Sequence, residues 1–181
     1  MLQGGGADPQ HNDDPTDFNL ISYLETHEVD SYEEFVDIIQ TVSPESVDEE
    51  TDKITSFSID IDYDNKIVSV TTIGEVSYDR LNGASNSASR SYYASSGTKI
   101  FTIKVSGTFG YTTGSCTTIS ASGSFTRPSG STWISSPTIS SGNITVRKAY
   151  ARISGTATSG ASSISYSLTL TCDDTGTFGS Y

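Results

Sequence analysis

The sequence predicts a mainly β fold: an antiparallel β-sandwich or partly closed barrel of seven to nine strands, with two short N-terminal α-helices. Three observations predict it. From residue 57 onward, apolar residues alternate with Ser, Thr and Asp, as in strands with one buried face. Turn residues recur roughly every ten positions through this region. Before residue 44, apolar residues recur at helical spacing instead.

The composition is that of a folded, polar chain. Of its 181 residues, 34% are hydrophobic and 18% charged, so much of the polarity comes from Ser, Thr and Gly. The length is enough to bury an ordinary core. No run approaches the roughly 20 apolar residues that span a bilayer, so we expect no membrane span. The sequence predicts no cofactor.

Charge divides the chain into an acidic and a basic part. Residues 1–80 hold 20 of the 22 acidic residues and three of the ten basic ones. The acidic segment is therefore expected either to dock on a basic sheet or to lie in solvent as a tether. This distribution argues against nucleic acid as a partner of the whole chain.

The N-terminal part reads as a leader followed by helices. Residues 1–16 are predicted to be a flexible leader and residues 17–53 an acidic helical segment, with a first helix to about His27. Ser31 and Glu34 form a capping-box pattern at the start of a second helix, which Pro44 ends. Residues 54–181 are predicted to form the β domain, either alone or as one domain with residues 17–53.

The first two strands are predicted to pair as a hairpin. If Asp64 and Asn65 form a two-residue turn, Ile61 lies opposite Val68 and the apolar positions of both strands share one face. The following residues, 77–98, show little periodicity and are expected to form a long surface loop or two short irregular strands.

Acidic residues at every second position before this turn resemble the opening of a calcium-binding loop. However, Asn65 stands where such a loop has Gly, and Thr71 stands where it has the bidentate Glu. A polar outer strand face is the favoured interpretation, with calcium at Asp62 and Asp64 as the alternative. No other metal site is predicted.

The region from Lys99 carries the clearest strands. Residues 101–111 form one, Thr113-Gly114-Ser115 a three-residue turn, and a return strand carries Ile119, Ala121 and Phe125. A single strand is expected over residues 144–157. The last strand alternates up to Cys172, which joins the core face.

The two cysteines, Cys116 and Cys172, are predicted to form a disulfide. Their even number and the Ser/Thr-rich strands favour a secreted protein whose signal peptide has been removed. The bond would close a loop of about 57 residues, stabilising the fold by roughly 4 kcal/mol. Two buried thiols or metal ligation are the alternatives. His11 and His27 lie far away in sequence, so a catalytic cysteine is not indicated.

Three aromatic residues are candidates for ligand binding. Tyr92 and Tyr93 are expected in a loop and Trp133 after a turn, where an exposed ring can stack on a sugar or contact a protein. The alternative for Trp133 is an anchor in the core.

Residues 99–176 resemble uncharacterised small secreted β-rich proteins of Gram-positive gut bacteria. The shared features are a stretch like Phe-Thr-Ile-Lys-Val-Ser-Gly-Thr-Phe-Gly-Tyr before a Cys, a central Trp, and a final Thr-Leu-Thr-Cys-Asp-Asp-x-Gly. The resemblance implies an exported β domain at the cell surface and no established activity.

Three functions follow as hypotheses. The first is a secreted, non-enzymatic β-sandwich that binds a protein or glycan at the cell surface. The second is a self-assembling subunit of a surface layer or filament that uses its N-terminal segment. The third is an enzyme or inhibitor with an acidic N-terminal pro-segment, for which the sequence shows no recognisable site.

Overall fold

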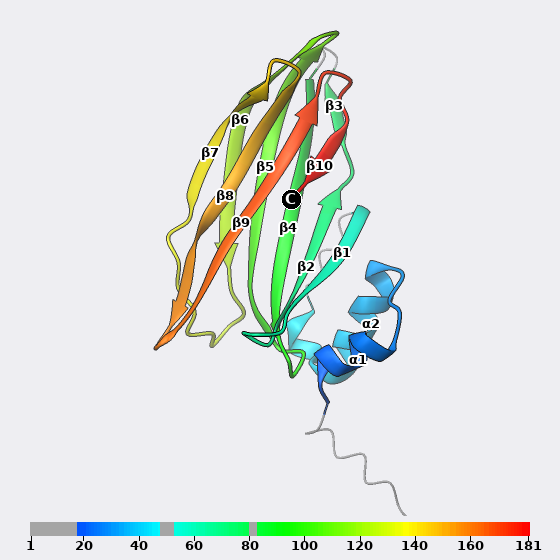
Figure 1. Cartoon of the computed structure of the whole chain (residues 1–181), viewed down its shortest axis with the longest axis vertical. Coiled ribbons are helices and arrows are strands. Elements are labelled where there is room, and N and C mark those ends of the chain that lie inside the picture. The colour runs from blue at the N-terminus through cyan, green and yellow to red at the C-terminus, as the bar shows by residue number, and fades with distance from the viewer. Residues whose placement is uncertain (1–17, 48–52, 80–82) are drawn as a thin grey trace, which may run out of the picture.

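The computed structural model describes residues 18–47, 53–79 and 83–181, which form two antiparallel β-sheets and two α-helices (Figure 1). Sheet A has the strand order β1-β2-β4-β5-β6, with β3 beside β4, and sheet B has the order β10-β9-β8-β7. The strands of sheet A are β1 (Ile54–Asp62), β2 (Ile67–Gly74), β3 (Ser77–Asp79), β4 (Gly83–Ala94), β5 (Lys99–Thr112) and β6 (Ser115–Thr126). Those of sheet B are β7 (Thr138–Thr145), β8 (Lys148–Ser159), β9 (Ser162–Asp173) and β10 (Phe178–Ser180).

The mainly β prediction is confirmed, but the strand count and the barrel alternative are wrong. Ten strands form among the described residues, and neither of their two sheets closes into a barrel. Residues 77–98, expected as a loop or irregular strands, contain the twelve-residue β4. Its buried positions include Ala84 and Ala88, which are too small to give a marked apolar alternation. The strand expected over 144–157 is instead the end of β7, a turn and most of β8.

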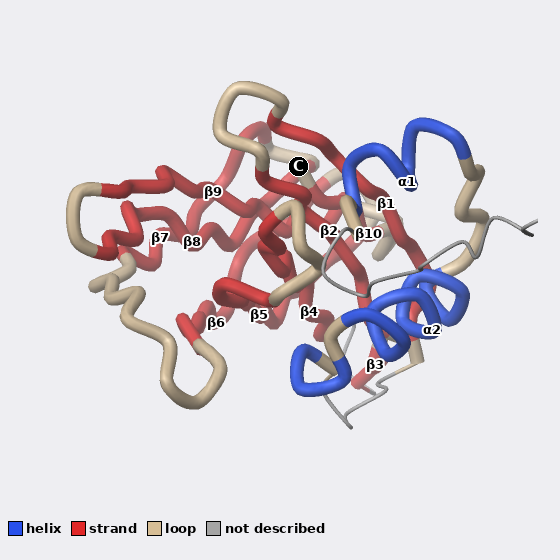
Figure 2. The backbone as a smooth tube through the Cα atoms, turned by 90° about the horizontal axis from the view of Figure 1, so that it is seen from below, coloured by secondary structure: helices blue, strands red, loops and turns tan. Residues whose placement is uncertain are grey.

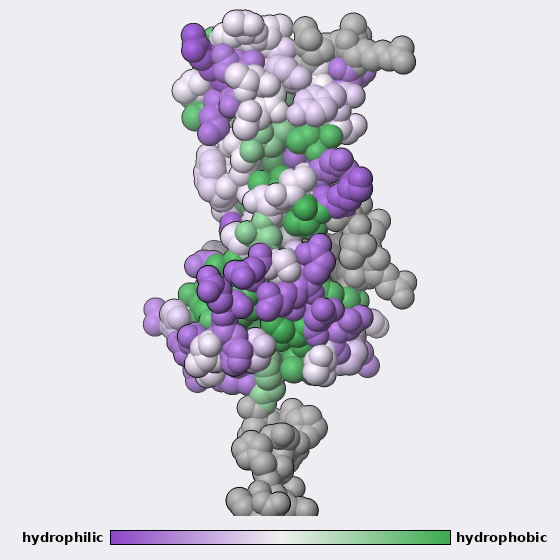
Figure 3. Space-filling view, turned by 90° about the vertical axis from the view of Figure 1, so that its right-hand side faces the viewer, coloured by the Kyte–Doolittle hydropathy of each residue, from purple (hydrophilic) through white to green (hydrophobic). Residues whose placement is uncertain are grey.

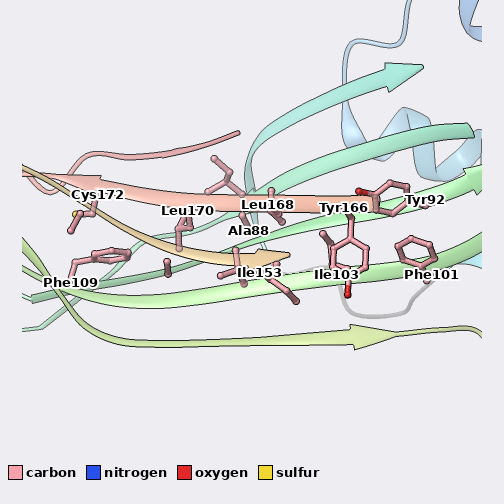
Figure 4. Close-up of a cluster of buried hydrophobic side chains, with 14 of the residues drawn as sticks. Ala88, Tyr92, Phe101, Ile103, Phe109, Ile153, Tyr166, Leu168, Leu170 and Cys172 are labelled. Carbon is pink, nitrogen blue, oxygen red and sulfur yellow. The ribbon is translucent and has the colours of Figure 1, made fainter. Parts of the chain in front are cut away.

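The main core lies between the two sheets. Phe101, Ile103 and Val105 of β5 are fully buried, as are Leu168 and Leu170 of β9, and all belong to one cluster. Figure 4 shows the labelled side chains of β5 and β9 gathered in the space between these strands. The two sheets therefore pack face to face.

Hydrogen bonds join the sheets along the side where β6 meets β7 and β8. The Cys116 amide donates to the Val146 carbonyl (3.0 Å), and Asn143 Nδ2 donates to the Cys116 carbonyl (2.6 Å). Nearby, Thr118 Oγ1 donates to the Tyr150 carbonyl (2.9 Å). The gap between the sheets is therefore bridged on this side.

The two predicted helices form close to their expected positions. They are α1 (Leu20–Thr26) and α2 (Tyr32–Val42), and a short 3-10 turn, η2 (Pro44–Ser46), follows α2. Ser31 Oγ accepts from the Glu34 amide (3.1 Å), which confirms the predicted cap of α2. The Glu34 carboxylate accepts from the Asp30 amide (3.1 Å), one residue before the cap itself. Within the described residues, no helix has the length and apolar character needed to cross a membrane.

The helices cover the outer face of sheet A, on the side away from β7 and β8 (Figure 2). Phe35 and Ile39 of α2 form a second core with Val68 and Val70 of β2 and with Tyr93 of β4. Figure 3 shows the surface of the molecule on the side of the helices. In its lower half, hydrophilic residues predominate, with hydrophobic ones between them. The apolar faces of α1 and α2 are thus buried against their own chain. The predicted leader, residues 1–16, and residues 48–52 lie outside the described residues.

The predicted register of the first hairpin is confirmed, although its turn is longer than expected. Ile61 pairs with Val68, and Asp62 pairs with Ile67, which leaves four residues, 63–66, in the turn. Lys66 has φ 55°, in the left-handed region. Lengthening the turn by one residue on each side keeps the same partners opposite each other, so the shared apolar face is preserved.

The hairpin between β5 and β6 departs from the prediction at two points. Thr112 pairs with Ser115, so its turn has two residues, with Gly114 at φ 88°. A bulge between Thr108 and Phe109 gives β6 one extra residue, Ile119, which is 66% exposed instead of facing the core.

Candidate functional site

A cleft of about 480 Å³ opens between the sheets on the side opposite the β6–β7 contact. The strands β1 and β2 lie at this edge of sheet A, where sheet B contributes only the beginning of β9 to the lining. We call it the inter-sheet cleft. It is lined by Asp60, Asp62, Asn65, Ile67, Ser69, Arg90, Tyr92, Ser163, Ile164 and Ser165.

The alternation of β1 explains why this lining is polar. Ile59 and Ile61 face the helices on the outer side of sheet A, so Asp60 and Asp62 must face the inner side. Elsewhere in sheet A the inner side is covered by sheet B and is apolar. At this edge the inner side stays accessible, and the two carboxylates lie on one face of the strand, roughly 6.5–7 Å apart along it.

Arg90 connects the two sheets beneath the cleft. Its Nε donates to Thr71 Oγ1 of β2 (2.8 Å), and its Nη1 donates to the Ser167 carbonyl of β9 (2.9 Å). A guanidinium held at two points has little freedom to rotate. Its remaining N–H groups provide fixed, charged donors on this side of the cleft.

Tyr92 lies beside Arg90 and is only 6% exposed. Its ring packs on Phe101, with the ring centroids 4.5 Å apart, as part of the main core. Burial raises the pKa of the Tyr92 phenol, while the neighbouring Arg90 opposes this increase. The phenol therefore stays neutral around pH 7, with a hydroxyl able to donate and to accept at the cleft.

Asp62 has a structural role in the hairpin turn. Its Oδ1 accepts from the amides of Asp64 (3.1 Å) and Asn65 (3.0 Å), and its Oδ2 accepts from Asn65 Nδ2 (2.7 Å). The hydrogen bond from the Asn65 side chain, followed by those from the backbone, lowers the pKa of Asp62. Asp62 is therefore an ionised acceptor and is unsuited to donate a proton at neutral pH.

The structure gives the calcium alternative at Asp62 and Asp64 no support. The Asp62 oxygens already accept three hydrogen bonds within the turn. In the part of the chain that the structure describes, no group of three or more His, Cys, Asp or Glu side chains is arranged to hold a metal ion.

Two of the predicted aromatic binding residues are buried, contrary to the expectation of exposed rings. Tyr93 is 4% exposed and packs on Phe35 beneath the helices, with a ring-centroid distance of 5.3 Å. Tyr92 and Tyr93 belong to a strand, so their side chains enter the two different cores. Trp133 is partly buried against the main core, 5.9 Å from Phe101, as the core-anchor alternative predicted. Of the three, Tyr92 lines the inter-sheet cleft.

A second polar surface lies on the outer face of sheet A, away from the cleft. It is a groove of about 270 Å³ along β4, β5 and β6, lined by Glu75, Ser85, Asn86, Ser87, Ser106, Gly107, Thr108, Ser120 and Ser122. Ser85 and Thr108 hydrogen-bond to each other across neighbouring strands (2.9 Å), so part of its polar surface is internally satisfied. Asn86 Nδ2 is buried and has no hydrogen-bond partner among the described residues.

The two cysteines lie in the main core as free thiols, and the structure does not contain the predicted disulfide. Both are fully buried. Burial, and then the interaction with Cys116, raises the pKa of Cys172 to about 12, and burial also raises the pKa of Cys116. Of the described residues, His27 is the one histidine, and its ring stacks on Tyr23 of α1, so neither thiol has a histidine beside it. His11 lies outside the described residues.

The sequence identified only part of the cleft. Asp62 and Tyr92 are candidates there for other roles, Asp60 belongs to the predicted polar strand face, and no sequence pattern marks Arg90. Arg90 stands in a Ser-rich run without apolar periodicity, which carries no signal of its neighbours. Comparisons of the chain with protein-family models, with curated proteins and with solved structures find no match.

Proposed function

We propose that this protein is a secreted, non-enzymatic β-sandwich that binds a glycan at the cell surface through the inter-sheet cleft. The observation that carries the proposal is the set of polar groups in the cleft: the carboxylates of Asp60 and Asp62, the Arg90 guanidinium and several hydroxyls. Carboxylates accept, guanidinium donates and hydroxyls do both. A sugar ring presents alternating hydroxyl donors and acceptors, which this set can match.

Size and charge support the same class of ligand. A volume of about 480 Å³ falls within the usual range of small-molecule sites. The lining combines two acidic side chains with one basic side chain, so it favours a neutral ligand over a strongly charged one. Ile67 and Ile164 supply apolar surface against which the carbon face of a sugar can pack.

The chemistry of the cleft fits binding better than hydrolysis. A glycosidase pairs an ionised carboxylate with a carboxylic acid whose pKa is raised. The turn lowers the pKa of Asp62, so it cannot fill the acid role. The side chains of Asp60 and Asp62 are both exposed to solvent.

The other two hypotheses receive less support. Described residues of α1 and α2 cover the outer face of sheet A and do not line the cleft, so their removal would not unmask it as a pro-segment would. Assembly by exchange of the N-terminal segment would require the helices to leave Val68, Val70 and Tyr93, where their apolar faces are already buried.

A glycan array followed by calorimetric titration tests the proposal. We expect binding to neutral oligosaccharides, and Asp60→Asn should weaken the affinity by about tenfold or more, because a hydrogen bond to a charged group contributes roughly 1.5–3 kcal/mol. Because the Asp60 side chain is exposed to solvent, we expect the Asp60→Asn variant to fold normally.

Two serine variants provide a matched comparison between the polar surfaces. Ser165→Ala alters the cleft, and Ser122→Ala alters the groove on the outer face of sheet A. We expect only Ser165→Ala to weaken binding. Failure to bind any glycan at protein concentrations suited to millimolar affinities would contradict the proposal, as would equal losses from both variants.

A further inference from the structure

We propose that Cys116 and Cys172 form a disulfide between the two sheets, and that their oxidation state is set while the chain folds and then retained. The inference goes beyond glycan binding and does not depend on it. Cys116 lies in β6 of sheet A and Cys172 in β9 of sheet B, so a bond between them would join the two layers covalently.

The arrangement of the two side chains supports a bond. Both are fully buried in the same core cluster, and each thiol affects the pKa of the other. Figure 4 shows Cys172 directed into the core near Phe109. The neighbour of Cys172 on β8 is Ala149, whose side chain is short.

The backbone around Cys116 is already fixed to sheet B. Its amide and carbonyl both take part in hydrogen bonds to the β7–β8 region, at 3.0 and 2.6 Å. A disulfide here would reinforce an existing junction between the layers without opening another part of the core.

The same burial protects the thiols once the protein has folded. Thiol–disulfide exchange begins with a thiolate that reaches an external disulfide. With its pKa raised to about 12, Cys172 forms thiolate much less readily at neutral pH than an ordinary cysteine does. With both sulfurs inaccessible to solvent, oxidant can react quickly only before the core closes or after it opens.

The reaction takes a low-molecular-weight disulfide, such as oxidised glutathione, as the oxidant. One cysteine thiolate attacks a sulfur of this disulfide and forms a mixed disulfide, releasing one glutathione thiolate. The second cysteine thiolate then attacks the mixed disulfide at the protein sulfur and releases the second glutathione. The protein loses two protons and two electrons, and one oxidised glutathione becomes two reduced molecules.

The cross-link and the cleft lie at opposite ends of the main core. In Figure 4, Cys172 marks one end of the labelled side chains and Tyr92 the other. At the cleft end the sheets are joined by the non-covalent bonds of Arg90. We therefore expect oxidation to stabilise the fold without changing ligand binding, so this inference and the proposed function can fail independently.

Refolding the full chain from urea with and without oxidised glutathione tests the inference. Mass spectrometry under denaturing, non-reducing conditions should show the oxidised product lighter by two hydrogen atoms, with no attached glutathione. Its Tm should exceed that of the reduced protein by roughly 10 °C, since closing a loop of this length stabilises a domain of this size to that extent. Retention of both thiols, or glutathione on each, would overturn the proposal.

A second measurement tests the retention of the oxidation state. Folded, reduced protein exposed to the same oxidant should cross-link at least a hundredfold more slowly than unfolded protein. Equal rates would show that the folded thiols are accessible and would refute this part. Cys116→Ser is the control: unfolded in oxidant, it should accumulate the mixed disulfide at Cys172, because it lacks the resolving thiol. The wild-type mass measurement remains decisive even if this variant does not refold.

Discussion

Tyr166 and Gly155 pair across β8 and β9, and the contact between them helps to place an aromatic ring in the core. A Cβ atom on Gly155 would lie 2.7 Å from the Tyr166 hydroxyl oxygen and 2.9 Å from Cζ. The hydroxyl also hydrogen-bonds with Ser135 Oγ (2.6 Å), and the ring packs on Phe101. The Tyr166 ring can therefore occupy this position because Gly155 has no side chain.

Gly155→Ala is expected to destabilise the protein by about 1–3 kcal/mol, because the added methyl group must displace the Tyr166 ring from a packed core. Urea unfolding monitored by fluorescence measures the change. Gly142→Ala is the matched control, since Gly142 also pairs with a tyrosine, Tyr150, but its Cβ would have ordinary contacts from 3.4 Å outward. We expect this control to change the free energy of unfolding by less than about 0.5 kcal/mol. Similar losses from both variants would disprove the role of the close contact.

At the scale of elements, the turn between β9 and β10 depends on one carboxylate. Asp173 Oδ1 accepts from the Thr175 amide (2.9 Å), the Thr175 hydroxyl (2.6 Å) and the Thr177 amide (3.0 Å). Partial burial alone would raise the pKa of Asp173, but the hydrogen bonds from Thr175 and Thr177 outweigh it and lower the pKa below its ordinary value. The ionised carboxylate thus holds β10 against β9.

This turn is expected to lose its stabilising effect in acid. Because the folded-state pKa of Asp173 lies below the unfolded value, its contribution is complete above the unfolded value and declines as the pH falls through the folded one. Asp173→Asn should therefore be less stable than the wild type at pH 7, with a smaller difference at pH 3. Thermal unfolding of both proteins across this range measures the effect. A stability difference independent of pH would contradict the assignment to the carboxylate charge.

At the scale of the whole molecule, three layers share two cores. The main core joins sheets A and B, and the second core joins sheet A to the helices. The main core is the larger of the two and contains residues from both sheets. The helical layer is small, since α1 has seven residues and α2 has eleven. The helical layer can therefore open while the two sheets stay packed.

Native-state hydrogen exchange should resolve these two units. We expect the amides of α1 and α2 to lose protection at lower urea concentrations than those of β5 and β9, since fewer buried contacts hold the helices. The central position of β5, paired on both sides, makes it the reference for global unfolding. Simultaneous loss of protection in the helices and β5 would show instead that residues 18–181 unfold as one cooperative unit.

The prediction of the fold succeeded where local pattern decides the outcome. The alternation in β1 and β2 specified which residues pair, because a one-residue slip would move every isoleucine and valine to the other face. The α2 cap followed from Ser31 and Glu34 alone. The prediction was wrong for residues 77–98, where neighbouring strands determine the structure. The residues of β4 show little alternation, but β4 is a long strand because β2, β3 and β5 flank it.

The sequence by itself determined the type of each strongly patterned element, the two N-terminal helices and the register of the first hairpin. These depend on residues a few positions apart, whose spacing is visible along the chain. Only the tertiary structure decided which layer covers each apolar face, and hence that Asp60 faces a cleft while Ile59 faces the helices. The cleft could not be predicted from the sequence, because Asp60, Arg90 and Ser165 come from three strands in two sheets. Contacts between such distant segments leave no periodic signal in the sequence.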